Sequence, residues 1–172
     1  MVSLILISIV LIGISIRDFA AREIEVYYFL LMAITVIVFC MVRTDVVTMI
    51  QNVLVNCIQL VLLLGCLIGY YQFRYGKADS NFFNTRLGIG DLLFWIVTTP
   101  LFAPVNFILW MVVSLLFSLV VHSCVVLVSG KKHSTVPLAG LQAIILIIVL
   151  MIDQFVLYFG LLENPLFLPA LN

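Results

Sequence analysis

Three aspartates lie where ionisable side chains are costly, inside or at the edge of long apolar runs of the sequence. They are Asp18, Asp91 and Asp153. A carboxyl group at such a position costs several kcal/mol unless it is paired or neutralised, so it is a functional candidate by default. These three side chains are therefore the first places to look for chemistry.

Asp18 and Asp91 are the more informative pair, because both are expected at the same face of a membrane. Two carboxyl groups within a few ångströms of each other cannot both ionise easily, so they share one proton over a wide range of pH. The ionised member can take a proton from water while the protonated member donates to a carbonyl oxygen. The pair predicts hydrolysis of an amide by water, with no metal ion and no organic cofactor.

The composition places this chemistry in a lipid bilayer. Of the 172 residues, 65% are hydrophobic and 9% are charged, with a mean hydropathy of +1.33, whereas a soluble domain is about half apolar and about a quarter charged. The net charge of 0 leaves no basic face for nucleic acid. The same numbers exclude disorder and a disulfide-bonded mini-domain. We expect residues 1–172 to form a single integral-membrane domain.

Continuous apolar runs predict an all-α, polytopic membrane helix bundle of about six transmembrane helices, not a β-barrel with alternating residues. A polar, aromatic loop is expected over 71–86. None of the four cysteines forms a C-x-x-C pair, so no zinc or redox site is predicted. The runs cover 2–16 (continuing past Asp18), 26–42, 46–70, 90 to a break at Pro100 or Pro104, 105–128 and 137–160.

Lysine and arginine set the orientation, because cytoplasmic loops carry an excess of both. With six spans, seven of the eight basic residues fall on one side and Arg43 alone falls on the other. We therefore expect a multi-pass protein of the cell inner (plasma) membrane with both termini outside. This orientation places Asp18 and Asp91 together in the cytoplasmic leaflet and Asp153 in the outer part of the last helix.

The sequence Gly88-Ile89-Gly90-Asp91 puts two glycines directly before the second acid. Without side chains, these glycines would let an extended substrate backbone approach Asp91 closely. As a bare pattern it is weak, since glycines at a helix start often only make a turn. Its weight comes from its position at the membrane boundary.

A simpler interpretation pairs each acid with a nearby base, Asp18 with Arg22 and Asp91 with Arg86. For either acid alone, that interpretation would be preferred. Two acids in one leaflet, one of them behind a pair of glycines, favour catalysis instead.

The segment Asp18-Phe-Ala-Ala-Arg22-Glu-Ile24 resembles the D-x-x-x-R-x-I motif at the first catalytic aspartate of type IV prepilin peptidases. Gly88-Ile89-Gly90-Asp91 resembles the G-x-G-D motif at the second. Val136-Pro137-Leu138-Ala139-Gly140 is similar, more loosely, to the apolar, proline-containing start of the family's last helix. The resemblance covers nearly the whole chain in order and spacing.

The resemblance implies a membrane aspartic endopeptidase with Asp18 and Asp91 as its catalytic pair. Its substrates would be prepilin, archaellin or pseudopilin precursors, which lose a short basic leader at the cytoplasmic face. The C-x-x-C insert associated with N-methylation in many bacterial members has no match here, so we predict cleavage without methylation. Glu25 stands where the family often has proline, and Leu92 where it often has lysine, which leaves the choice of substrate open.

Acidic residues of the predicted cytoplasmic loops could attract a basic leader peptide. The aromatic loop before Asp91 is expected to anchor in the headgroup layer and to help hold the substrate. A homo-oligomer is compatible with the sequence. Besides the two glycines, the expected substrate contacts are Arg22, Glu23, Glu25 and Asp79.

Two other functions stay open. A proton- or ion-coupled membrane carrier could use Asp18, Asp91 and Asp153, although a path should distribute its acids through the whole membrane. A catalytically inactive subunit of a pilus or secretion assembly could keep a protease-like fold. Presenilin-type proteases also carry G-x-G-D, but the Tyr-Asp motif of that family is absent from the sequence.

Overall fold

Long apolar runs form helices throughout the part of the chain that the structure, a computed structural model, describes: residues 2–21, 24–75, 88–129 and 137–154. Every regular element in these ranges is helical, which confirms the all-α class. The helices are α1 (Val2–Ala21), α2 (Val26–Arg43), α3 (Val46–Tyr75), α5 (Ile89–Thr98), the 3-10 helix η1 (Thr99–Leu101), α6 (Pro104–Ser129) and α7 (Leu138–Ile152).

Four of these helices, α1, α2, α3 and α6, are long and apolar enough to cross a membrane. The described parts of α5 and α7 are apolar but shorter. Several long apolar helices in one chain indicate a multi-pass membrane protein. The number of spans stays a prediction.

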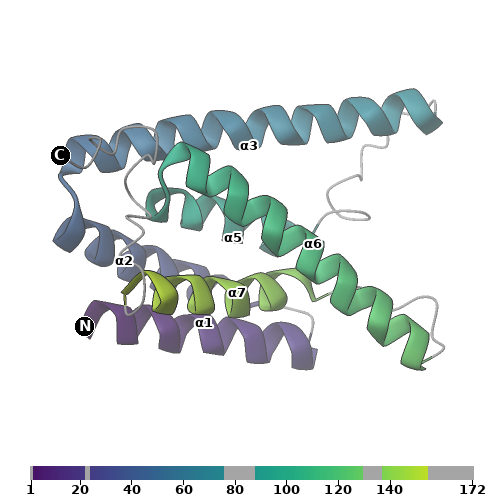
Figure 1. Cartoon of the computed structure of the whole chain (residues 1–172), viewed down its shortest axis with the longest axis horizontal. Helices are drawn as coiled ribbons and strands as arrows, with labels where there is room; N and C mark the ends of the chain where they lie inside the picture. The colour runs from purple at the N-terminus through teal and green to yellow at the C-terminus, as the bar shows by residue number, and fades with distance from the viewer. Residues whose placement is uncertain (1, 22–23, 76–87, 130–136, 155–172) are drawn as a thin grey trace, which may run out of the picture.

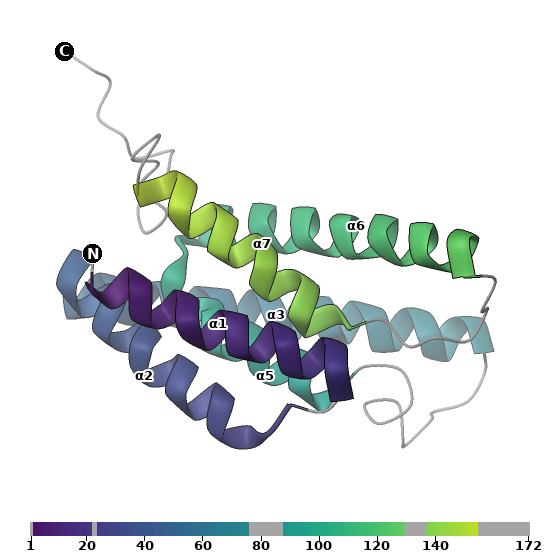
Figure 2. The ribbon, with the colours of Figure 1, turned by 90° about the horizontal axis from the view of Figure 1, so that it is seen from below.

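Successive helices run in opposite directions along the bundle (Figures 1 and 2). We call the end at which α1, α3 and α6 finish, and α2, α5 and α7 begin, the site end, and the opposite end the far end. Among the described basic residues, Arg17 and Arg74 lie at the site end, and Arg43 lies at the far end. This matches the partition that six alternating spans predict. Which face meets the cytoplasm stays a prediction.

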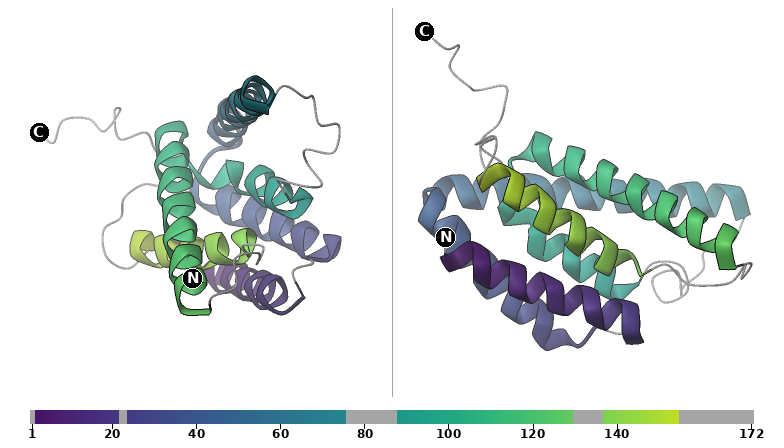
Figure 3. Two further views of the ribbon diagram at one scale, coloured as in Figure 1. Left: turned by 90° about the vertical axis from the view of Figure 1, so that its right-hand side faces the viewer. Right: turned by 60° about the horizontal axis from the view of Figure 1, so that its bottom comes forward.

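Helix α1 packs between α2 and α7, and α5 contacts α2 and α7. The longer helices α3 and α6 extend past these four at the site end (Figure 1), and α3 stands at the edge of the bundle when seen from that end (Figure 3, left). The site end of the four central helices is therefore recessed behind the ends of α3 and α6.

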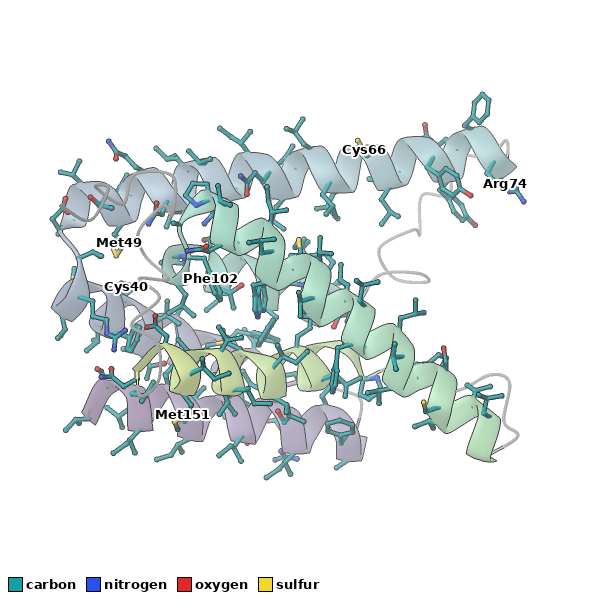
Figure 4. All side chains as sticks on the ribbon, viewed as in Figure 1. Cys40, Met49, Cys66, Arg74, Phe102 and Met151 are labelled. Atoms are coloured by element: carbon teal, nitrogen blue, oxygen red, sulfur yellow. The ribbon has the colours of Figure 1, made fainter. Side chains whose placement is uncertain are left out.

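Helix α3 continues to Tyr75, so the first residues of the predicted loop over 71–86 are helical instead. Neither glycine nor proline occurs among these residues, so nothing stops the helix there. At about 1.5 Å per residue its 30 residues span about 45 Å, more than the roughly 30 Å hydrocarbon core. Figure 4 shows Arg74 at this projecting end, where Phe73 is 94% exposed.

The predicted proline break is confirmed between α5 and α6, and side chains from other helices satisfy the carbonyl groups that it frees. The Asn56 amide nitrogen donates to the carbonyl oxygens of Thr99 and Phe102, each at 2.8 Å. The Cys40 thiol lies 3.3 Å from the carbonyl oxygen of Pro100. Because lipid offers no hydrogen bonds, irregular backbone at this depth needs such partners.

Candidate active site

Asp18 lies in the last turn of α1 on the face that packs against α7, and it is only 8% exposed. Its carboxylate accepts the backbone N–H of Gly140 at 2.6 Å. One turn earlier, the Ser15 hydroxyl donates to the carbonyl oxygen of Gly140 at 3.1 Å. Helix α1 therefore holds both main-chain polar groups of Gly140.

Gly140 is required for this close approach of α7 to α1. A Cβ atom at residue 140 would lie 3.0 Å from Oδ2 and 3.1 Å from Cβ of Asp18, and 3.3 Å from a ring carbon of Phe19. Two of these neighbours belong to the buried side chain of Asp18, which its hydrogen bond to Gly140 already holds in place. A methyl group could be accommodated only if α7 moved away from the carboxylate.

Asp91 is the third residue of α5, after the N-cap residue Gly88. Its carboxyl group lies beside the backbone of Gly88. A Cβ atom on Gly88 would lie 3.0 Å from Oδ2 of Asp91, and the φ of Gly88 is an ordinary −66°. Glycine at residue 88 therefore provides space beside the carboxyl group rather than an unusual backbone conformation.

Gly90 faces a different neighbour from Gly88. A Cβ atom there would be 3.7 Å from the Phe29 ring and 3.9 Å from the Ile24 side chain, which are ordinary contacts. The structure therefore puts Gly90 against the start of α2. Its predicted contact with substrate stays a prediction.

The two aspartates meet at the first turn of α7. Asp91 interacts with the backbone amide of Ala139, next to the Gly140 amide that Asp18 accepts, and the two carboxyl groups are close enough to interact electrostatically. Pro137 at the N-cap of α7 supplies no side-chain cap, and first-turn N–H groups have no partner within a helix. The Asp18 carboxylate from α1 takes that place, with the Asp91 carboxyl group from α5 close by, where the positive end of the helix dipole favours negative charge.

This arrangement brings together two acids from distant parts of the sequence, oriented by adjacent amides. Such a pair can hold one proton and move it between a water molecule and a carbonyl group. Within the described ranges, no salt bridge reaches Asp91, and no cluster of three or more His, Cys, Asp or Glu residues could hold a metal ion.

Of the predicted substrate contacts, Glu25 is exposed just before α2 and lies 3.5 Å from the Arg17 guanidinium. Arg17 is half-exposed and interacts with residues at the start of α2. Arg22, Glu23 and Asp79 lie outside the described residues, as does the Arg86 partner considered for Asp91.

Asp153 lies at the far end, at the end of α7, and is 4% exposed. Arg43, the last residue of α2, donates to its Oδ2 at 2.8 Å. Arg43 also hydrogen-bonds Gln154 and lies over the Phe39 ring, 4.5 Å from its centre. Asp153 therefore forms a bond within the bundle and does not lie beside the acid pair.

Sequence reasoning gave no specific role to Ser15, Ala139 or Gly140. The only signal for the two α7 residues was the loose similarity of the segment around Pro137. Ser15 could have been found as the residue one helical turn before Asp18, on the same face. Main-chain amides leave no mark in a sequence, so their part in the site becomes visible only in three dimensions.

No protein-family model, curated protein or solved structure matches the chain. The functional assignment therefore rests on the residues themselves and on the geometry at the start of α7.

Proposed function

We propose that the chain is a membrane aspartic endopeptidase that removes the short basic leader of type IV prepilin-like precursors at the cytoplasmic face. The observation that carries the proposal is the meeting of Asp18 and Asp91 at the first turn of α7. The substrate class comes from the resemblance of the segments around these two residues to the two prepilin peptidase motifs.

In the proposed reaction, the pair begins with one proton shared between two carboxyl groups. The ionised carboxylate takes a proton from water as the water oxygen bonds to the scissile carbonyl carbon, while the other acid protonates the carbonyl oxygen. Collapse of the tetrahedral intermediate breaks the C–N bond: the protonated acid gives its proton to the departing amine, and the ionised acid takes a hydroxyl proton from the intermediate as the C=O bond re-forms. The pair therefore again holds one proton. The acid and base roles belong to the pair, not to one residue.

The N-terminus of α7 would orient the pair and stabilise its charge throughout this cycle. The Gly140 amide donates to the Asp18 carboxylate, and the Ala139 amide lies near the Asp91 carboxyl group. Since the pair carries one negative charge at both the start and the end, the dipole of α7 favours the reactive state without any rearrangement.

The leader would be recognised by charge. Glu25 is exposed at the site end, and in this proposal Glu23 and Asp79 join it in attracting the basic leader. Arg22, Gly88 and Gly90 complete the proposed substrate contacts.

The carrier alternative gains no support from the third acid. Asp153 is buried at the far end and neutralised by Arg43, as a group with a structural role would be. If the chain is an inactive subunit, the two aspartates serve only to cap the N-terminus of α7.

Asparagine variants separate chemistry from capping. An asparagine side-chain oxygen still accepts a main-chain N–H, but it cannot exchange a proton with water. We expect Asp18→Asn and Asp91→Asn each to abolish the mobility shift of a co-expressed prepilin-like precursor, while the protein still inserts into the membrane. Asp45→Asn is the matched control, because Asp45 is an exposed cap at the start of α3 and asparagine also caps well.

The wild type and Asp45→Asn should cleave the precursor equally. Cleavage retained by either active-site variant would refute the two-acid mechanism, and a wild type that cleaves no such precursor would refute the proposed substrate class.

A further inference from the structure

A second polar contact joins α5 to α7 one helical turn deeper than the acid pair. The Trp95 indole N–H donates to Oε1 of Gln142 at 2.8 Å. Trp95 is 2% exposed and Gln142 is 0% exposed. Neither residue is used by the proposed mechanism, and both sit among apolar side chains.

Helical spacing places this contact directly behind the site. Trp95 follows Asp91 by four residues on α5, and Gln142 follows Ala139 by three on α7, so each pair shares one face of its helix. The two helices are therefore joined by two successive polar contacts, about 5 Å apart along the axis. The outer contact is the approach of the Asp91 carboxyl group to the Ala139 amide, and the inner one is the hydrogen bond between Trp95 and Gln142.

The inner contact belongs to a series of hydrogen bonds in which both the oxygen and the nitrogen of the Gln142 side-chain amide have a partner. The Gln142 amide nitrogen lies 3.4 Å from the Ser114 hydroxyl, and Ser114 in turn donates to the carbonyl oxygen of Met111 at 3.0 Å. Because the amide nitrogen of Gln142 faces Ser114, its Oε1 atom faces the Trp95 indole. A fully satisfied buried network of this kind rigidifies the elements that it joins.

Helix α5 needs such a restraint. It has 10 residues and gives way to η1 at the proline break, so few turns are available to hold Asp91 in place. A misplacement of about 1 Å at a reacting group can cost about 100-fold in rate.

We infer that Trp95 and Gln142 are positioning residues, whose hydrogen bond keeps Asp91 in register with the first turn of α7 and with Asp18. This inference rests on the proposed function. It predicts that removing the bond lowers the rate of the chemical step and leaves substrate binding unchanged.

The test compares Trp95→Phe and Gln142→Met with Thr98→Val. The first two variants remove one side of the bond and keep most of the side-chain volume. Thr98 is 0% exposed on the same helix, and its hydroxyl donates to the Trp95 carbonyl oxygen at 2.8 Å. The control therefore loses a buried hydrogen bond that lies within α5 and joins no other helix.

With purified protein and a cleavable precursor, we expect kcat to fall by about 10- to 100-fold in Trp95→Phe and in Gln142→Met, with KM unchanged. The double variant should be no worse than the more affected single variant, because both changes remove the same bond. Thr98→Val should keep the kcat of the wild type.

A second measurement needs no substrate. Spin labels on Ile96 of α5 and Ile148 of α7, both exposed, report the separation of the two helices. The background variant has Cys40 replaced by serine, which keeps a donor for the Pro100 carbonyl, and the other three cysteines replaced by alanine. The distance distribution should broaden in Trp95→Phe and Gln142→Met but not in Thr98→Val.

The outcomes distinguish this inference from the proposed function. If the wild type cleaves but the two variants match Thr98→Val in kcat, the inference is wrong and the proposed function stands. If the wild type cleaves nothing, the proposed function fails, and a broadened distance distribution would then show a structural link with no part in a reaction.

Discussion

The two ends of α7 both carry a buried carboxylate, but they neutralise it in opposite ways. At the far end, Asp153 lies against the Arg43 guanidinium. At the site end, Asp18 accepts the Gly140 amide, and Asp91 lies near the Ala139 amide and close enough to Asp18 to interact electrostatically. At one end of α7 an acid is paired with a cation, and at the other end two acids lie near uncharged main-chain donors.

The difference indicates which end can do chemistry. The Arg43 guanidinium neutralises the charge of the Asp153 carboxylate and holds it by a hydrogen bond. Two neighbouring carboxyl groups held by amides can keep one proton between them and pass it on. The far end thus serves as an anchor, and the site end is suited to catalysis.

The largest effect on stability is expected when the anchor is broken. Arg43→Met leaves the Asp153 carboxylate buried without its cation, which should cost about 3–5 kcal/mol of unfolding free energy. Unfolding of the reconstituted protein in denaturant measures this loss. Replacing Asp153 by leucine in the same chain should recover part of it, since no unpaired charge then remains. If the single variant is as stable as the wild type, the far end is not an anchor.

The next effect, on activity, is expected at residue 140. Gly140→Ala would put a methyl group about 3 Å from the Asp18 carboxylate and displace the first turn of α7, and we expect cleavage to fall by about 100-fold. Gly69→Ala is the matched control, because a Cβ atom there meets nothing within 4 Å. Equal activity of the two variants would contradict the close packing of α7 on α1.

A smaller and selective effect is expected from charge at the site end. Glu25→Lys should weaken cleavage of a basic-leader precursor by no more than about fivefold, because Glu25 is exposed and its charge is screened. Cleavage of a precursor with a neutral leader should not change. Assays of both precursors at low and high salt measure this effect, and an equal loss on both would remove the recognition hypothesis.

The smallest effect is expected at an exposed acid of the far end. Hydrogen bonds from the Thr48 hydroxyl and amide lower the pKa of Asp45 below its usual value. This contribution to stability is therefore fully present above the unfolded pKa of about 3.9 and is lost as the pH falls through the lower folded value. Asp45→Ala should remove this part of the acid dependence of unfolding and leave cleavage at neutral pH intact.

Much of this arrangement could be predicted because it depends on apolar runs and the order of charges. Runs interrupted at residue 18, at Arg43 and at Pro100 gave the helices, and alternating directions put Asp18 and Asp91 at one end. The end of α3 was predicted too early, because tyrosine, glutamine and arginine read as a loop although nothing stops the helix there.

The site could be predicted only as a pair of acids. What holds the pair is the backbone of Ala139 and Gly140, together with a serine and a buried glutamine that look like ordinary helix residues. Such contacts depend on how α1, α5 and α7 pack, and no local pattern records them. Asn56 is similar, because its role follows from carbonyl groups that a distant proline leaves unpaired.

Infrared absorption detects whether Asp18 and Asp91 share one proton. Reconstituted wild-type protein at neutral pH should show the C=O stretch of one protonated carboxyl group. Asp18→Asn and Asp91→Asn should each lose that band, because a single acid held by amides has no neighbouring charge to keep it protonated. If the wild type lacks the band, or the band survives in both variants, the two aspartates do not share a proton.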